Sequence, residues 1–491
     1  METEENEKVY KYICTAAVVA GAIIILLVLF TSPMPGVADQ GDFERVMRAT
    51  GLEETDRKLK SYEQLWFKYV VPEYKMKFSN IIRLAGILPT TSMIYPITIT
   101  KLISRLTGSG YFNTKTLAAV YSIMYIAALY MCFKYIKIKN ICTRIFFIIL
   151  SLFILMDGNY LVWFNSLYGE SMMIIGLIMF ISAMLYTINS EEEKSTKKLF
   201  FMFAGGVLFL GSKLQCFSAL PLILLLIFRM IYLQGAKLSP YKLRRYLAIP
   251  TFILLFYVGG IYVQISSTCG EDTKYNSVFY GVLMISKSPE KDLAVLGLPA
   301  DMALDAGKHA YLPKDQYVKY VPWSDTTKTE FNEKISNTKL LKFYLLQPKK
   351  LIEGMEYTAS KAFDTGTSLG KFEKSDISEY TYKLNRFTLW SDIRNTKFPK
   401  KLIFIATVYL IVVSVSIIEY IKRKDDKRTR LNLELLWSVM LIGLLQFPMP
   451  FIGNGEADTA KQLFLFNFTF DIVILVSFTW IFDKVYKRIT G

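Results

Sequence analysis

Ten apolar segments, each close to the length needed to cross a membrane, dominate the sequence. A helix needs about 20 mainly apolar residues to span the hydrocarbon core of a bilayer. Hydrophobic residues make up 52% of the 491-residue chain and are gathered into runs. The sequence therefore predicts an all-α polytopic membrane protein with about ten transmembrane helices, in a range of ten to twelve. The segments are 10–31, 115–134, 145–162, 171–188, 199–212, 217–233, 246–265, 400–419, 433–450 and 463–482.

Lysine and arginine residues are distributed unevenly among the segments that join these runs. Five joining segments hold 21 Lys and Arg residues, whereas the short segments between them hold only Lys213 and Lys461. Because basic residues collect on the cytoplasmic side, this asymmetry predicts two cytoplasmic termini, with 32–114 and 266–398 outside. The net charge of +16 lies mostly in these loops, so no nucleic-acid partner is expected. The basic segments are 134–144, 191–198, 229–245, 421–430 and 484–491; the short ones are 163–170, 213–216 and 451–462.

This topology divides the chain into five parts. In the first outer segment, residues 59–69 and 95–108 have the apolar spacing of helices that lie in the membrane interface. Residues 95–108 are alternatively an eleventh span. In the outer domain, short helices are predicted to begin near Pro289 and Pro299. The parts are 1–31, the cytoplasmic tail and first transmembrane helix; 32–114, the first outer segment; 115–265, a transmembrane bundle; 266–398, a mostly α outer domain; and 399–491, the C-terminal transmembrane helices with the last outer loop, 448–462.

Charged side chains recur in four outer segments that are far apart in the sequence. Each has an ordinary explanation, because charged loop ends are usually solvated and an interfacial lysine extends to water. Glu170 is harder to explain in this way, since a carboxylate among aromatic residues gains nothing from burial. Together the segments favour an outer-surface site for a phosphate-bearing lipid and a hydroxyl nucleophile. They contribute Asp39, Asp42 and Arg45; Glu170; Lys213; and Glu456, Asp458 and Lys461.

These residue types fit the transfer of a sugar from a lipid-linked donor to a hydroxyl group. A carboxylate can act as the base, and a second one can stabilise the oxocarbenium character of the transition state. Lysines can bind the donor phosphate and its leaving charge. A carboxylate is the expected base because His309 is the only histidine. The same scarcity excludes a multi-histidine metal site. No cofactor is predicted, although carboxylates leave room for Mg²⁺ or Mn²⁺.

Five stretches of the sequence carry a resemblance to a known class of enzymes. They are "GDFERVMRATGL", "WFNSLYGES", "GSKLQ", "NSVFYGVL" and "GNGEADTAKQLFLFNFTFD", and they are spread over nearly the whole chain. In this order and topology the chain resembles the GT-C class of membrane glycosyltransferases, and is similar to bacterial hexose transferases of cell-surface glycan biosynthesis. The resemblance implies a polyprenyl-phosphate sugar donor, used at the outer face of the bacterial cytoplasmic membrane by an inverting mechanism. The acceptor would be a surface polysaccharide, a teichoic acid or a glycolipid.

The resemblance also implies roles for the charged residues of the first three outer segments. The catalytic aspartate of the class corresponds to Asp42, with Asp39 as the neighbouring candidate. The second acidic position corresponds to Glu170, and Lys213 is assigned to the donor phosphate. Arg45 is expected to pair with Asp42, which would lower the pKa of that carboxyl and hold it ionised. Such a carboxylate is well positioned but a weaker base, so Asp42 is either a base or an orienting group.

The last outer loop matches the family pattern with one departure. Glu456, Asp458 and Lys461 correspond to its charged positions and are predicted to bind substrate. Related sequences often have a histidine after that lysine, whereas this chain has Gln462. The departure makes a metal ion at this loop less expected.

Three other functions compete with glycosyl transfer. A transporter or flippase of lipid-linked sugars would carry ionisable residues within its spans, where this chain has only Asp157 and Asp471 as notable examples. A polysaccharide polymerase or ligase would rely on Arg and His in the outer domain, which offers His309, Arg386 and Arg394. A non-enzymatic scaffold of the envelope is the third alternative.

Overall fold

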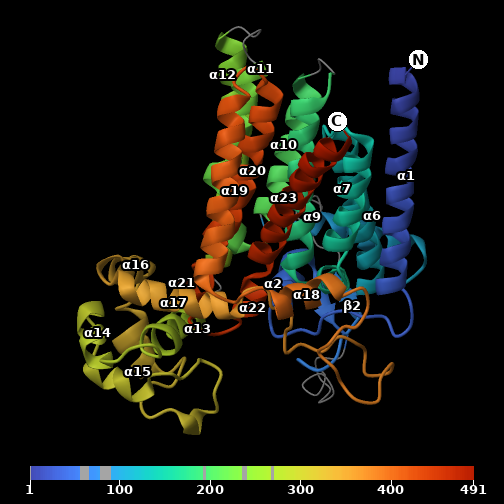
Figure 1. Cartoon of the computed structure of the whole chain (residues 1–491). Helices are drawn as coiled ribbons and strands as arrows, with labels where there is room; N and C mark the ends of the chain where they lie inside the picture. Colours follow the sequence, from blue (N-terminus) through green and yellow to red (C-terminus); the bar gives the residue numbers. More distant parts are fainter. Residues whose placement is uncertain are drawn as a thin grey trace.

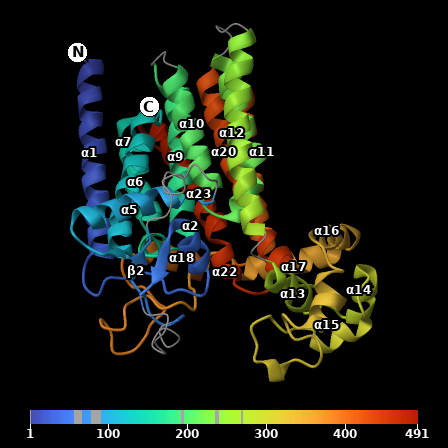
Figure 2. The ribbon, with the colours of Figure 1, turned by 180° about the vertical axis from the view of Figure 1, so that it is seen from behind.

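The computed structural model describes residues 2–55, 66–77, 90–191, 195–234, 240–266 and 270–490. Long helices stand side by side in a bundle, and the first outer segment and the outer domain lie at one end of it (Figure 1). Both termini lie toward the opposite end, as Figure 2 also shows from behind. The prediction of an all-α polytopic membrane protein is confirmed. The bundle helices are α1 (Glu2–Leu29), α6 (Thr114–Tyr135), α7 (Ile141–Leu155), α9 (Gly169–Asn189), α10 (Ser195–Leu210), α11 (Leu220–Gln234), α12 (Pro240–Ser266), α19 (Leu402–Lys422), α20 (Lys427–Gln446) and α23 (Phe464–Thr490).

The criteria of helix length and hydropathy identify fewer membrane spans among the described residues than the ten predicted from the sequence. Within the described residues, seven helices are long and apolar enough to cross a membrane, and a bent pair makes an eighth. The two remaining predicted spans correspond to α10, which has 16 residues, and to α12, whose apolar part is Thr251–Val263. All ten predicted segments are therefore helical, and up to eight of them meet the criterion for a span within the part of the chain that the structure describes.

Helix α9 is the most deeply buried of these spans, with 94% of its apolar window inside the protein. Its contact with α10 depends on two glycines. A Cβ on Gly176 would lie 2.6 Å from the backbone nitrogen of Phe209, and one on Gly205 would lie 2.7 Å from the Cα of Phe180. Small residues of this kind let membrane helices approach each other closely. The close packing fixes the first turn of α9, which carries Glu170.

The bent pair breaks where the outer domain packs against the bundle. Helices α7 and α8 (Gly158–Leu161) meet at an angle of 54°. The Asp157 carboxylate accepts the Asn159 amide and begins α8. A Cβ on Gly158 would lie 2.0 Å from the carbonyl oxygen of Arg386, and the Gly158 amide donates to the Phe387 carbonyl. The break at Gly158 therefore allows the backbone of residues 386–391 to pack directly against the bundle.

The first outer segment forms a small sheet that the sequence analysis did not predict. Strands β1 (Leu52–Glu54), β2 (Glu73–Met76) and β3 (Tyr111–Asn113) are antiparallel in the order β1-β2-β3. Residues Leu52 and Met76 are opposite each other, as are Tyr74 and Phe112. Strands of three or four residues are too short for an alternating pattern to identify them.

Two helices flank this sheet, α2 (Phe43–Thr50) and α5 (Ile94–Leu106). The buried Lys101 of α5 donates to the carbonyls of Thr50, Gly51 and Lys77, which fixes the end of α2. With 13 residues, α5 is about 20 Å long and too short for the alternative eleventh span. Of the other predicted interfacial helix, 56–65 lie outside the described residues, and 66–69 form a turn.

The described part of the outer domain consists of short helices joined by loops. Pro289 begins a helix as predicted, whereas Pro299 precedes a 3₁₀ helix. The elements are α13 (Glu271–Ser277), η4 (Val278–Val282), α14 (Pro289–Leu296), η5 (Ala300–Asp305), η6 (Lys314–Gln316), α15 (Asp325–Thr327), η7 (Lys328–Asn332), α16 (Asn337–Leu346), α17 (Pro348–Lys361) and α18 (Leu389–Lys397).

Candidate functional site

Two predicted site residues that are 419 positions apart meet at the end of the bundle where the predicted outer segments lie. Asp42 stands immediately before α2, and its Oδ2 lies 2.5 Å from the Nζ of Lys461. Lys461 belongs to α22 (Thr459–Gln462) and is 7% exposed, whereas the Asp42 side chain is 33% exposed. The Lys461 ammonium also lies 4.7 Å from the centre of the Tyr168 ring. The pair is thus held in a largely dry place that solutes can still reach from the Asp42 side.

The loop before Asp42 is fixed by hydrogen bonds to a tyrosine and to an aspartate. The Tyr168 hydroxyl donates to the Ala38 carbonyl and accepts the Gln40 amide. The Oδ1 of Asp39 accepts the amides of Gly41 and Phe43, at 2.8 Å and 3.2 Å. Asp39 therefore shapes the turn that presents Asp42, and Tyr168 holds this turn at the start of α9.

A second buried charge pair lies at the start of α9. The Nζ of Lys213 is 2.5 Å from the Oε1 of Glu170, whose side chain is 1% exposed. Lys213 precedes the 3₁₀ helix η2 (Leu214–Ala219). The chain before η2 packs directly against the start of α9, where only glycine fits, since a Cβ on Gly169 would lie 2.6 Å from the Ser212 carbonyl oxygen. Among the described residues, the Glu170 Oε2 is buried without a hydrogen-bond partner. Such an oxygen can accept a hydrogen bond from a ligand or from water.

The surroundings of Asp42 and Asp39 shift the pKa values of these two carboxyl groups in opposite directions. Burial alone would raise the pKa of Asp42, but the charges of Lys461, Lys213 and Arg45 outweigh it and hold the pKa below its ordinary value. Burial raises the pKa of Asp39 to about 6, against the hydrogen bonds from two backbone amides. Asp42 thus stays ionised over the physiological range. Its contact partner is Lys461, and Arg45, expected as the partner, acts on it through charge.

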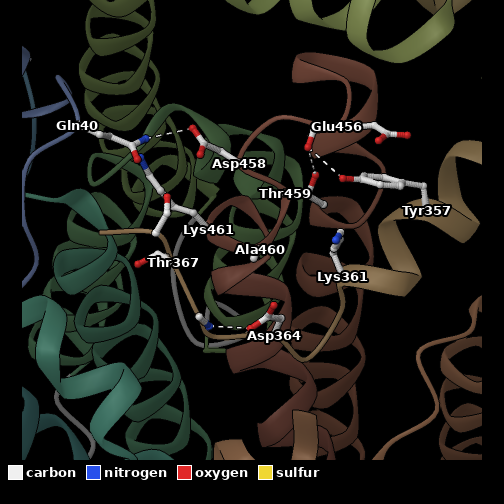
Figure 3. Close-up of a pocket in the computed structure, with 12 residues that line it drawn as sticks. Gln40, Tyr357, Lys361, Asp364, Thr367, Glu456, Asp458, Thr459, Ala460 and Lys461 are labelled. Carbon is white, nitrogen blue, oxygen red and sulfur yellow. Dashed lines mark hydrogen bonds between the residues drawn. The ribbon is translucent and has the colours of Figure 1, made fainter. Parts of the chain in front are cut away.

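A polar cavity of about 240 Å³ opens beside Lys461 (Figure 3). The first outer segment, α17 with the loop that follows it, and the last outer loop form its walls. Gln40 donates to the Oδ2 of Asp458 at 3.1 Å, and the Tyr357 hydroxyl donates to the Glu456 carbonyl at 3.0 Å. The cavity is lined by Gln40, Tyr357, Lys361, Asp364, Gly366, Thr367, Ser368, Glu456, Asp458, Thr459, Ala460 and Lys461.

A smaller cavity of about 70 Å³ is basic. It contains Lys213 with two arginines of α2, Arg45 and Arg48, and Gly169 at the start of α9. The positive end of the α9 dipole and the cationic side chains together favour an anion. Its other lining residues are Val46, Ala49, Thr90, Thr91, Met93 and Ser212.

All the predicted site residues except Asp39, whose carboxylate accepts the amides of Gly41 and Phe43, occur at these pairs and cavities. Asp42, Lys461, Glu170 and Lys213 form the two pairs, Arg45 lines the basic cavity, and Glu456 and Asp458 line the polar one. Sequence reasoning missed Gln40, Tyr168, Arg48, Tyr357, Lys361 and Asp364. The stretches "DQGD" and "WFNSLYGES" contain the first two, but Lys361 and Asp364 approach the last outer loop only through tertiary packing. No group of three or more His, Cys, Asp or Glu arranged for a metal ion occurs among the described residues.

The two acidic residues within the bundle lie elsewhere. Asp157 accepts the amide and hydroxyl of Ser391. Asp471 pairs with Arg394, both side chains fully buried, and accepts the Tyr160 hydroxyl. Neither aspartate lines either cavity. These contacts attach α18 to α8 and α23, so both residues have a structural explanation.

Comparisons with known proteins place the chain in a family. It is 23% identical over 385 residues to a protein of Escherichia coli (strain K12) named "Uncharacterized protein YfdI", a match covering 77% of this chain and 78% of that protein. No solved structure matches the chain. The model of the family described as the YfdI N-terminal transmembrane domain matches residues 2–490. The chain therefore belongs to the YfdI N-terminal transmembrane domain family.

Proposed function

We propose that this protein is a membrane glycosyltransferase that moves a hexose from a polyprenyl-phosphate donor to a surface glycan or glycolipid. The observation that carries the proposal is that the cations around Asp42 line two unlike cavities. Lys461, its contact partner, lines the polar cavity, whereas Arg45 and Lys213, whose charges keep it ionised, line the basic one. A reaction between a phosphate-linked donor and a hydroxyl acceptor needs a cationic place for the phosphate and a separate polar place for the acceptor.

The basic cavity is the proposed place of the donor phosphate. Arg45, Arg48 and Lys213 supply positive charge there, and Gly169 adds the start of a 21-residue helix. Cations and a helix N-terminus stabilise the charge that grows on the phosphate as the sugar–oxygen bond breaks. Lys213 then exchanges part of its contact with Glu170 for the phosphate. The free Oε2 of Glu170 is available to a sugar hydroxyl.

The polar cavity beside Lys461 is the proposed entrance of the acceptor. In the transfer, the acceptor oxygen bonds to the anomeric carbon, the bond from that carbon to the phosphate oxygen breaks, and polyprenyl phosphate leaves. The hydroxyl proton passes to Asp42 or to water oriented by it. Because the low pKa of Asp42 makes it a weak base, orientation of the nucleophile is as important as proton removal. A single displacement of this kind inverts the anomeric configuration.

The chain is proposed to act in the bacterial cytoplasmic membrane, with both termini inside and this site on the outer face. The unequal distribution of basic residues supports the orientation. The second candidate, a flippase, is less favoured because Asp157 and Asp471 have structural partners.

The two functions are separated by one experiment in proteoliposomes. Purified protein is reconstituted with a radiolabelled polyprenyl-phosphate hexose, and surface glycan extracted from the source bacterium is added outside. Transfer predicts label in the glycan together with released polyprenyl phosphate. Label that crosses the bilayer while still attached to the lipid, with none in the glycan, would contradict the proposal and favour the flippase.

A further inference from the structure

A row of aromatic rings extends from the last outer loop across the outer domain. We call Tyr280, His309, Tyr311 and Trp323 the aromatic row. Ring centres are 5.4 Å apart between Tyr280 and His309, 6.3 Å between His309 and Tyr311, and 6.1 Å between Tyr311 and Trp323. Tyr311 is 59% exposed and Trp323 is 58% exposed. Packing within the domain therefore does not account for the outer half of the row.

The loop that carries the row is fixed by buried polar contacts. Asp305 accepts three consecutive backbone amides, 318–320, and is fully buried. The Tyr317 hydroxyl donates to the His309 carbonyl, and Asn276 accepts the Ala310 amide. Trp323 has a φ of 61°, in the left-handed region that is unfavourable for a bulky side chain. An exposed tryptophan held in such a conformation indicates a function for its position.

The inner end of the row adjoins the candidate site. The Glu456 amide donates to the Tyr280 carbonyl, and a Cβ on Gly455 would lie 2.5 Å from that oxygen, so the last outer loop packs tightly against Tyr280. Burial lowers the pKa of His309, and the nearby charge of Asp458 opposes this shift. Burial, the hydrogen bond to Asp272, and the charges of Asp272, Asp458 and Asp42 raise the pKa of Tyr311.

The chemistry of the row suits a saccharide chain. Flat rings that are exposed on one face offer apolar contact to the C–H faces of sugar rings, while their polar edges bind hydroxyl groups. Tyr311 donates to Asp272, whose carboxylate can also accept a sugar hydroxyl. The Nδ1 of His309 accepts the Tyr311 amide, which leaves Nε2–H of the neutral ring as a donor. Apolar faces and hydrogen-bonding edges thus alternate along the row.

We propose that the aromatic row is the binding track of the acceptor glycan, along which a chain of several sugar units lies with its nucleophilic hydroxyl at Asp42. The inference rests on the proposed function, because it assigns the acceptor of that same site. It commits to an extended saccharide rather than a single sugar, since the row continues outward to Trp323. The exposed rings of Tyr311 and Trp323 account for affinity, and Tyr311 is close enough to interact electrostatically with Asp42.

The test compares Tyr311→Ala and Trp323→Ala with Tyr382→Ala, which removes an exposed aromatic of the same domain outside the row. Oligosaccharides released from the surface glycan of the source bacterium by mild acid, and fractionated by length, are the acceptors. Each row variant is expected to raise KM for long acceptors about threefold to tenfold. The KM for the shortest acceptor and the acceptor-independent hydrolysis of the lipid donor should not change. Equal KM values in all variants would overturn the inference.

A binding measurement separates this inference from the proposed function. Titration of wild-type protein with the long oligosaccharides should change its tryptophan fluorescence, and the change should be lost in Trp323→Phe. If the protein transfers no sugar but the Trp323-dependent signal is present, the function fails and the glycan track remains. If no such signal is seen, the inference fails. A spectral change on moving into phosphatidylethanolamine–phosphatidylglycerol nanodiscs, with none on adding oligosaccharide, would identify a membrane anchor and also overturn it.

Discussion

Two of the regions where the molecule buries charge pairs differ in what surrounds the pairs. In the bundle, Arg394 and Asp471 form a pair whose side chains are both 0% exposed. At the outer end, Asp42 pairs with Lys461 while remaining 33% exposed, and Lys213 of the neighbouring pair is 16% exposed. The outer pairs adjoin two cavities, whereas neither member of the bundle pair lines them.

This difference shows how a structural charge pair can be told from a functional one. Desolvation of two charges costs several kcal/mol, and removing one partner leaves the other buried and uncompensated. A sealed pair can only hold elements together. A pair beside a cavity, in contrast, can release a cation to a ligand.

The largest effect is expected from breaking the sealed pair. Asp471→Asn should lower the free energy of unfolding by about 3–5 kcal/mol, because Arg394 would keep a buried and unpaired charge. Thermal unfolding in detergent measures the loss. Asp483→Asn is the control, since Asp483 pairs with an exposed lysine on the same helix and should cost less than about 1 kcal/mol. Equal losses in the two variants would contradict the distinction.

The next prediction concerns Lys213 of the pair at the start of α9. Lys213→Met should raise KM for the lipid donor about tenfold to a hundredfold, because a charge-assisted contact to the phosphate is lost. Its control is Lys115→Met, which also breaks a pair, with Glu373, but lines neither cavity. Initial rates at varied donor concentration provide the measurement. If Lys115→Met had the same effect, the basic cavity would lose its assigned role.

The pH dependence of transfer distinguishes Asp42 from Asp39. Asp42 stays ionised far into the acid range, so kcat/KM should remain within about twofold down to about pH 5. The pKa of Asp39 is about 6, so a requirement for its ionised form would lower kcat/KM about tenfold per pH unit below that value. An acid limb near pH 6 would therefore transfer the catalytic assignment to Asp39.

A further effect concerns a buried lysine outside both pairs. Lys371 is 2% exposed and donates to the Thr367 hydroxyl, and burial lowers its pKa from 10.5 to about 7. Between these values the unfolded chain holds a proton that the folded chain has lost, so stability rises with pH, by at most about 1.4 kcal/mol per unit. The thermal midpoint should increase from about pH 7.5 to about pH 9, and Lys371→Met should remove this increase. A midpoint in Lys371→Met that rises as in the wild type would contradict the assignment.

Hydropathy was sufficient to locate every bundle helix because span length is a property of local sequence. It could not reveal the break at Gly158, which depends on a carbonyl 228 residues away. For the same reason, alternation could not detect strands of three or four residues in the first outer segment.

The charged residues of four predicted outer loops included all the members of the two pairs, but the sequence did not show which residue contacts which. Arg45 was expected to contact Asp42 because it is near in sequence, yet Lys461 does so from the other end of the chain. The α2 helix instead places Arg45 along the basic cavity. Tyr168 and the aromatic row remained hidden because aromatic residues are common throughout this chain, and only tertiary contacts distinguish them.

The most direct test of the central claim measures transfer and folding together in two variants. Asp42→Asn removes the outer charge, and the double variant Arg394→Met with Asp471→Leu removes the sealed pair without leaving a charge unpaired. In proteoliposomes with labelled donor and extracted glycan, Asp42→Asn should remain folded, although less stable because Lys461 loses its partner, and should lose at least about a hundredfold in transfer rate. The double variant should fold and retain transfer within about threefold, since replacing a buried pair by apolar groups is often neutral. Full transfer by well-folded Asp42→Asn, or its loss in the folded double variant, would contradict the account.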